Sequence, residues 1–217
     1  MKIFDIDGPF QYYGGILFDL LISNLIWIFI SVFSFGILSG PATLALYQSV
    51  YRGILLKDGY PFKTFFLSFK TRFFYQLGFC FFYFAMMLLT VMNLYLTLTG
   101  QFGTIWLLPV YFFIFMELAL TGTVAFPLLS QNRDLRFLDL LKISFIIANK
   151  HLPWVFLATI PNVILVVLVV LTFSGYLQLT IFLFFFPALN ALAISQFVLK
   201  KVLERYQHFK TFQGNFF

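Results

Sequence analysis

The sequence predicts an all-α protein, a polytopic bundle of transmembrane helices, and three observations predict this class. Of its 217 residues, 61% are hydrophobic and 10% are charged, and the mean hydropathy is +0.95. Soluble domains carry about 25% charged residues, so no soluble core of this length could hide so much apolar surface. The 34 phenylalanines suit a surface that faces lipid. Several apolar runs also reach the roughly 20 residues that a helix needs to cross a bilayer.

Five such runs are the predicted spans of a single membrane domain covering residues 1–217. They lie at about residues 16–38, 73–99, 104–129, 153–173 and 177–199. The segment before the first run, MKIFDIDGPF, has one lysine and two aspartates, unlike the basic start of a signal peptide. We therefore expect the first run to be retained as a membrane helix.

The basic residues are distributed very unevenly between the spans. Of the 14 lysines and arginines, all but Lys2 fall in two long connections, at 52–72 and 133–150, or in the tail after residue 199. The short connections near residues 100 and 175 carry none. Cytoplasmic loops are enriched in Lys and Arg, so both long connections and the C-terminus are predicted to be cytoplasmic. With five spans, the N-terminus lies outside.

The stretch SGPATLALYQSVYRGILL, residues 39–56, leaves that number of spans open. If it crosses the bilayer, there are six spans and the N-terminus is inside, while every later charge keeps its side. Pro41 fits the first turn of a helix, which leaves about 16 residues before Lys57. Gln48, Ser49 and Arg52 also give this helix a polar side. We favour a short helix at about 41–57 that folds back against the bundle or lies at the cytoplasmic interface.

Two basic segments predict short cytoplasmic amphipathic helices. They read FKTFFLSFKTRFFYQ and LRFLDLLKISFIIANK. In the second, apolar and small residues recur at helical spacing, namely Phe137, Leu140, Leu141, Ser144, Phe145 and Ala148. Their basic residues either attract anionic cytoplasmic lipids and fix the topology, or form a docking surface for a partner. The Pro-containing stretches SFGILSGPA and TVAFPLLSQ precede these segments, which indicates either an internal repeat or a chance likeness of two hairpins.

Two ionisable residues lie inside predicted spans. A charge is costly there, so such residues are candidates for a functional role. Asp19 lies within a turn of the start of the first span and is read as an interfacial cap, whereas Glu117 lies at the centre of YFFIFMELALTGTVAF. Glu117 has three open roles: it bonds a neighbouring asparagine and holds the bundle together, it lines a polar pathway, or it pairs with another subunit. The candidate asparagines are Asn93, Asn162 and Asn190.

The residue inventory argues against an enzyme. His151 and His208 both lie outside the predicted spans, so no intramembrane metal or Ser-His site is expected. The phosphate-binding pattern GxxxxGK[ST] is absent from the sequence, and the single cysteine, Cys80, cannot form an intramolecular disulfide. We expect no catalytic residue, no cofactor and no metal. The basic residues follow a membrane edge, so the lipid bilayer rather than nucleic acid is the expected partner.

The segment FGILSGPATLALYQSVYRGILLKDG, followed by FKTFFLSFKTRFFYQLGF, resembles the YesL family of small bacterial membrane proteins. The family-like turn comprises Gly40, Pro41, Ala42 and Thr43. The later AFPLLSQ and LLKISFIIANKHLPW resemble the second half of the family, so the resemblance covers roughly residues 14–205. The YesL family was long described as a domain of unknown function.

Members of the family are often encoded beside carbohydrate-uptake ATP-binding-cassette transporters in Gram-positive bacteria, and the resemblance implies a multi-pass protein of the bacterial plasma membrane. The implied role is a non-enzymatic accessory subunit that contacts the permease and ATPase subunits of a sugar importer. The sequence lacks the EAA…G coupling loop of the importer permeases themselves. The alternative is a small independent transporter or channel that acts as an oligomer.

Overall fold

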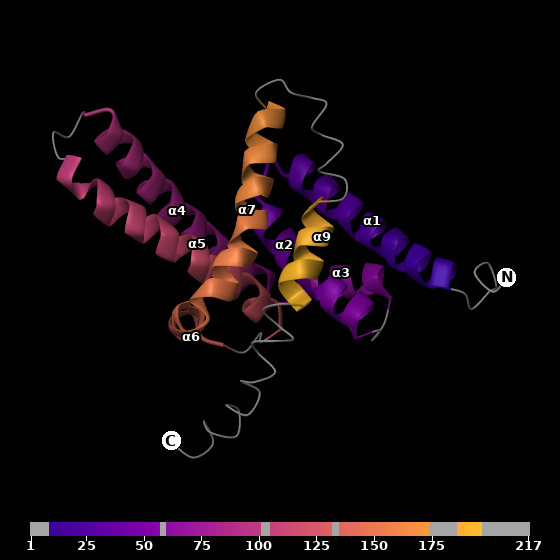
Figure 1. Ribbon diagram of the computed structural model, residues 1–217. Coiled ribbons are helices and arrows are strands. Elements are labelled where there is room, and N and C mark those ends of the chain that lie inside the picture. Colours follow the sequence, from indigo (N-terminus) through magenta and orange to yellow (C-terminus); the bar gives the residue numbers. More distant parts are fainter. Residues whose placement is uncertain (1–8, 57–59, 101–104, 132–134, 174–185, 197–217) are drawn as a thin grey trace, which may run out of the picture.

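The computed structural model describes residues 9–56, 60–100, 105–131, 135–173 and 186–196, and every regular element among them is helical (Figure 1). The first half of the chain contains α1 (Pro9–Phe33), α2 (Ser39–Gln48), the π-helical η1 (Ser49–Leu55), α3 (Pro61–Lys70) and α4 (Phe73–Leu98). The second half contains the 3₁₀ turn η2 (Ile105–Leu107), α5 (Leu108–Gln131), α6 (Phe137–Lys150), α7 (Leu152–Phe173) and α9 (Phe186–Ile194).

Three of the described helices are long and apolar enough to cross a membrane. They are Gly14–Phe33, Phe73–Leu98 and Ile105–Gln131. A fourth span results if α6 and the first part of α7, which meet at 109°, are taken together. The predicted fifth span at 177–199 falls partly outside the described residues, which show only α9 within it. The predicted class of membrane helix bundle therefore stands, with three to four candidate spans where the sequence predicted five.

The first span ends at Phe33, five residues before the predicted end, because the chain turns sharply there. Phe35 and Gly36 adopt positive φ angles of 51° and 82°, in the left-handed region that glycine tolerates best. The Gly36 N–H donates to the Ser31 carbonyl at 2.8 Å, and the Leu38 N–H donates to Ser34 Oγ at 3.1 Å. These bonds satisfy the end of α1 and reverse the chain into α2.

Helix α2 folds back along α1 in the antiparallel direction. Trp27 Nε1 donates to Thr43 Oγ1 at 2.9 Å, and the Ser23 and Ser49 hydroxyl oxygens lie 3.0 Å apart. Positions later in α1 therefore face positions earlier in α2. In the same register, the end of η1 returns to the level at which the apolar part of α1 begins. The segment is therefore packed against the bundle rather than set apart at an interface, and its antiparallel course along α1 is the course that the six-span alternative requires.

Helix α2 is the central helix of the described structure. It contacts α1, α3, α4, α5 and α9, and Ala42, Leu44 and Ala45 have no exposed surface. Gly40 makes this position possible, because a Cβ placed on it would lie 2.6 Å from Cys80 Sγ of α4. Part of the predicted polar side of this segment is buried too: Gln48 and Ser49 are 3% and 0% exposed, whereas Arg52 is exposed.

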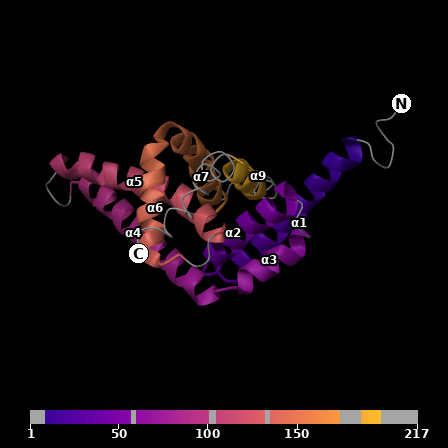
Figure 2. The same ribbon diagram turned by 90° about the horizontal axis from the view of Figure 1, so that it is seen from below.

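Helices α3 and α6 lie at the same end of the bundle, at the bottom of Figure 1, and Figure 2 views the molecule from that end. In α6 the buried stripe consists of Leu140, Ser144, Ile147 and Ala148. The predicted stripe was wrong at Phe145, which is 50% exposed. The helix is rotated slightly further than we predicted, so that Ile147 points inward in its place.

The two halves of the chain share an order of elements that differs from the predicted repeat. The two stretches of the possible repeat occupy different places, because SFGILSGPA forms a turn and the start of α2, while TVAFPLLSQ ends α5. The matching units are instead α2–α3–α4 and α5–α6–α7. In each unit a buried helix is followed by a short basic helix packed against it and then by a long apolar helix.

The α4–α5 hairpin leans away from α1 and α7 (Figure 1) and is held together by a notch at Gly122. The Tyr83 ring of α4 fills this notch, and its hydroxyl donates to the Leu118 carbonyl at 2.6 Å. Ala125, one turn further along, is fully buried. Gly78, which has nothing within 4 Å of the position of its missing Cβ, plays no such part.

Replacing Gly122 by alanine should destabilise the protein by about 1–3 kcal/mol, because the added Cβ overlaps the Tyr83 phenol ring. The matched control is Gly78→Ala on α4, where the methyl group meets open space. That change should be neutral or stabilise by up to about 1 kcal/mol through helix propensity. Thermal unfolding of the two variants in the same detergent checks the difference. Equal melting temperatures of the two variants would show that the Tyr83 ring does not need a glycine at position 122.

Candidate functional site

A chain of polar side chains, all buried except the half-buried Asn162, joins α5, α7 and α9. Asn190 Nδ2 of α9 donates to Asn162 Oδ1 of α7 at 2.7 Å, and Asn162 Nδ2 donates to Thr123 Oγ1 of α5 at 3.1 Å. The Thr123 and Thr159 hydroxyl oxygens lie 3.0 Å apart. Two of the three predicted asparagines therefore bond each other, and sequence reasoning missed both threonines of this network.

A second polar cluster joins α1, the α2–η1 segment and α3. Ser49 Oγ lies 3.0 Å from Ser23 Oγ and donates to the Pro61 carbonyl at 2.9 Å. Ser68 Oγ of α3 donates to Gln48 Oε1 at 2.6 Å. These bonds explain why polar residues are tolerated in a central helix: a buried polar group is costly only when it has no hydrogen-bond partner.

Glu117 lies at the middle of α5, half-buried, and its partner comes from α6. Asn149 Nδ2 donates to Glu117 Oε2 at 3.2 Å and to the Phe145 carbonyl at 3.1 Å. Helix α6 packs along α5 after a short connection, which brings its last turn level with Glu117. None of the hydrogen bonds described for Asn93, Asn162 or Asn190 reaches Glu117.

Asp19 and Asn93 lie apart from both polar clusters. Asp19 is half-buried on α1, next to the buried Leu20. Asn93 is half-buried on α4, and it donates an exposed hydrogen bond to the Leu89 carbonyl of its own helix at 2.9 Å. The five candidate polar residues therefore do not form one site: Asn162 and Asn190 belong to the polar network, and Glu117, Asp19 and Asn93 occupy three other places.

The family-like turn forms the first turn of α2, and each of its residues has a packing role. Gly40 allows the close approach to Cys80, Pro41 is buried in the first helical turn, and Ala42 has no exposed surface. Thr43 accepts the Trp27 indole N–H and donates to the Ser39 carbonyl at 2.7 Å. These four residues position α2 rather than form a reactive centre.

Within the described residues, no group of three or more His, Cys, Asp or Glu side chains could hold a metal ion. His151 caps the C-terminus of α6 at a half-buried position, and His208 lies outside the described residues. The two polar clusters link helices by hydrogen bonds, and in a bilayer unpaired polar groups are costly.

Replacing Asn162 by leucine should destabilise the protein by about 1–3 kcal/mol, because it removes the bond to Thr123 and leaves the buried Asn190 amide without its acceptor. Asn93→Leu is the control, since that amide bonds only a carbonyl of its own helix and lies exposed; it should leave stability unchanged or raise it. Thermal unfolding in detergent separates the two. A smaller loss for Asn162→Leu than for Asn93→Leu would refute the network.

Replacing Glu117 by glutamine should change the melting temperature little, because the amide oxygen still accepts the Asn149 N–H. Glu117→Leu removes the acceptor and should cost about 0.6 kcal/mol, the average for hydrogen bonds between membrane helices. Asn149→Leu should cost about the same, and the double variant should add little to either. Additive losses in this double-mutant cycle would show that the two side chains do not interact.

Comparison with known proteins identifies one family. Residues 20–94 match the family model described as "Protein of unknown function, DUF624". The matched segment runs from α1 through the whole of α2 and α3 and most of α4, and so includes the family-like turn. The chain matches no curated protein, and it matches no solved structure.

Proposed function

We propose that this protein is a non-enzymatic accessory subunit of a carbohydrate-uptake ATP-binding-cassette transporter, because residues 20–94 match the model of the DUF624 family, which is the YesL family. It acts in the plasma membrane of a bacterium and contacts the permease and ATPase subunits. The family resemblance supports the class of partner, and the surface of the α4–α5 hairpin supports the contact itself.

The observation that carries the proposal is the contrast between the two halves of α5. From Leu120 to Ser130 almost every residue is buried against the rest of the chain. Before Glu117, the helix exposes an apolar stripe with helical spacing, in which Val110 is 51%, Phe113 65% and Ile114 40% exposed. This stripe ends at Glu117, so a partner helix lying along it would meet the carboxylate and the Asn149 amide at its end.

The polar residues that bond one another between helices support a subunit rather than an independent transporter. Asn190, Asn162 and Thr123 bond one another across three helices, which ties the bundle together. A transport path needs polar groups that face water or substrate instead. Gly122 and Ala125 are buried inside this chain, so the proposed contact relies on the stripe and Glu117.

The proposed orientation places α3, α6 and the C-terminus in the cytoplasm. The basic residues Lys63, Lys70, Arg136 and Lys142 are exposed on or beside these two helices, which lie at one end of the bundle. The antiparallel packing of α2 and η1 on α1 returns the chain to the level at which the apolar part of α1 begins. This favours the six-span alternative, with the N-terminus in the cytoplasm, over the five-span arrangement.

The proposal is tested by purifying the tagged protein from its native membrane in mild detergent and identifying co-purified proteins by mass spectrometry. Permease and ATPase subunits of a sugar importer should appear in a fixed ratio to the chain. Recovery of the chain alone, as a homogeneous oligomer, would contradict the proposal and favour an independent transporter or channel.

The contact is tested by the same purification with Phe113→Ala, which shortens the exposed stripe on α5. The matched control is Phe84→Ala on α4, since Phe84 and Phe113 are 66% and 65% exposed. Phe113→Ala should lower the recovered importer subunits several-fold, while Phe84→Ala and the folding of both variants stay as in the wild type. If both variants lost co-purified importer subunits equally, the exposed stripe on α5 would not be the contact.

A further inference from the structure

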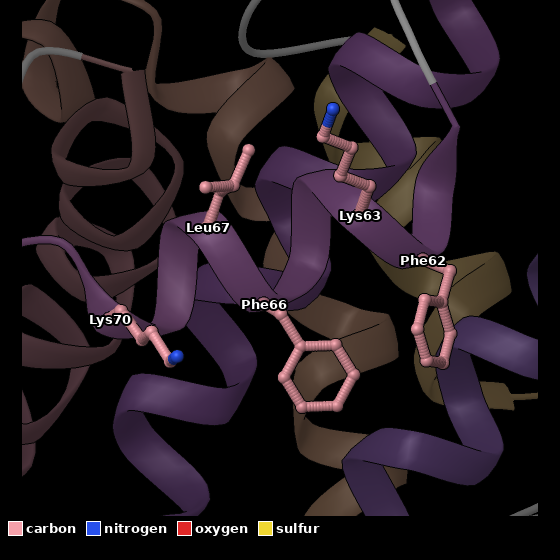
Figure 3. A pocket seen from close by; sticks show the side chains of 5 residues that line it. All are labelled: Phe62, Lys63, Phe66, Leu67 and Lys70. Atoms are coloured by element: carbon pink, nitrogen blue, oxygen red, sulfur yellow. The ribbon is translucent and has the colours of Figure 1, made fainter.

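Helix α3 presents an outer face that none of the proposed contacts uses. This face forms a shallow groove of about 330 Å³, lined by Phe62, Lys63, Phe66, Leu67 and Lys70 (Figure 3). Phe62 and Leu67 are 55% and 56% exposed, although both are large apolar side chains. The neighbouring Tyr60 is 81% exposed.

The inner face of α3 fixes the helix rigidly, so the outer face has a defined orientation. Phe65 is fully buried, and Ser68 donates to Gln48 of α2. The Pro61 carbonyl accepts a hydrogen bond from the Ser49 hydroxyl. The Pro61 ring also packs closely on Gly53, since a Cβ on that glycine would lie 2.8 Å from Pro61 Cγ. Helix α3 cannot rotate to hide its outer aromatic residues without breaking these contacts.

The outer face consists of two adjacent stripes of different chemistry. Lys63, Leu67 and Lys70 follow one another at i, i+4 and i+7, and so share one side of the helix. Phe62 and Phe66 form the second stripe, with ring centroids 5.0 Å apart. Figure 3 shows Lys63 and Leu67 on one side of the ribbon and the two phenylalanine rings on the other, with Lys70, where the two stripes adjoin, on the side of the rings.

The position of α3 along the chain sets its depth in the bilayer. Its ten residues are too few to cross the hydrocarbon core. Only Thr71 and Arg72 separate it from Phe73, the first residue of the apolar 26-residue helix α4. The outer face of α3 therefore lies at the level where a spanning helix enters the lipid, beside the phospholipid headgroups.

We propose that the outer face of α3 binds anionic phospholipids of the leaflet at this end of the bundle. Lys63 and Lys70 bind the phosphate groups, and Phe62 and Phe66 lie against the upper parts of the acyl chains. The charge supports this occupant, since residues 60–79 contain three basic residues and no acidic one. The pairing of an aromatic stripe with a basic stripe is the arrangement by which helices lie in the membrane interface.

The test compares lipid retention by the full-length protein in nanodiscs that contain equal amounts of phosphatidylglycerol and phosphatidylcholine. Lipids that remain bound after transfer to mild detergent are counted by native mass spectrometry. The wild type should retain phosphatidylglycerol in preference, and Lys63→Gln with Lys70→Gln should lower that preference by about fivefold or more, because each lysine near an anionic surface adds attraction. Phe62→Leu with Phe66→Leu should lower retention of both lipids.

The matched control removes two exposed charges from the region of α6, with Arg136→Gln and Lys142→Gln, and should leave the preference near the wild-type value. Excess glycerol phosphate should not displace the bound lipid, which separates a phospholipid from a free phosphate as the ligand. The proposal is overturned if the α3 variant keeps the wild-type preference, or if the α6 variant loses as much. It is also overturned if the α3 variant loses a co-purified protein with its lipids unchanged. Equal melting temperatures exclude misfolding as the cause.

Discussion

The structure depends on the burial of α2 on every side, and the narrowest point of that burial is the contact of Gly40 with Cys80. Any side chain on Gly40 would overlap the cysteine and push α4 away from α2. The next residues, Ala42, Leu44 and Ala45, are also fully buried, so α1, α3, α4, α5 and α9 can all reach the same helix. In lipid, such close approach matters more than apolar character, because lipid tails solvate apolar side chains as well as another helix does.

Burial of α2 has a second requirement, which is that its polar residues find partners. Gln48 accepts from Ser68, and Ser49 lies between Ser23 and the Pro61 carbonyl. These bonds fix α3 against the central helix and leave its outer phenylalanines and lysines free to face the bilayer. The network of Asn190, Asn162 and Thr123 does the same for α5, α7 and α9. The polar residues thus specify which helices meet, while the apolar residues keep them in the membrane.

The long helices could be predicted from the sequence, because α4, α5 and α7 are apolar runs bounded by charges and turns. The place of α2 could not, since Gln48 and Ser49 indicate a water-facing side unless their partners on α1 and α3 are known. The Asn149–Glu117 contact has the same origin: the two residues are 32 positions apart and meet only because α6 packs along α5. The contact of Tyr83 with Gly122 likewise depends on the packing of α4 against α5.

The central claim is that α2 returns the chain to the end of the bundle from which α1 starts. The most direct measurement is a pair of topology reporters in living bacteria, an alkaline phosphatase and a fluorescent protein, each fused in turn to the N-terminus and the C-terminus. The account predicts that both ends are cytoplasmic, with the fluorescent protein bright and the phosphatase inactive at each. An active phosphatase at the N-terminus, with the C-terminus still cytoplasmic, would show that α2 does not return across the membrane and would contradict the account.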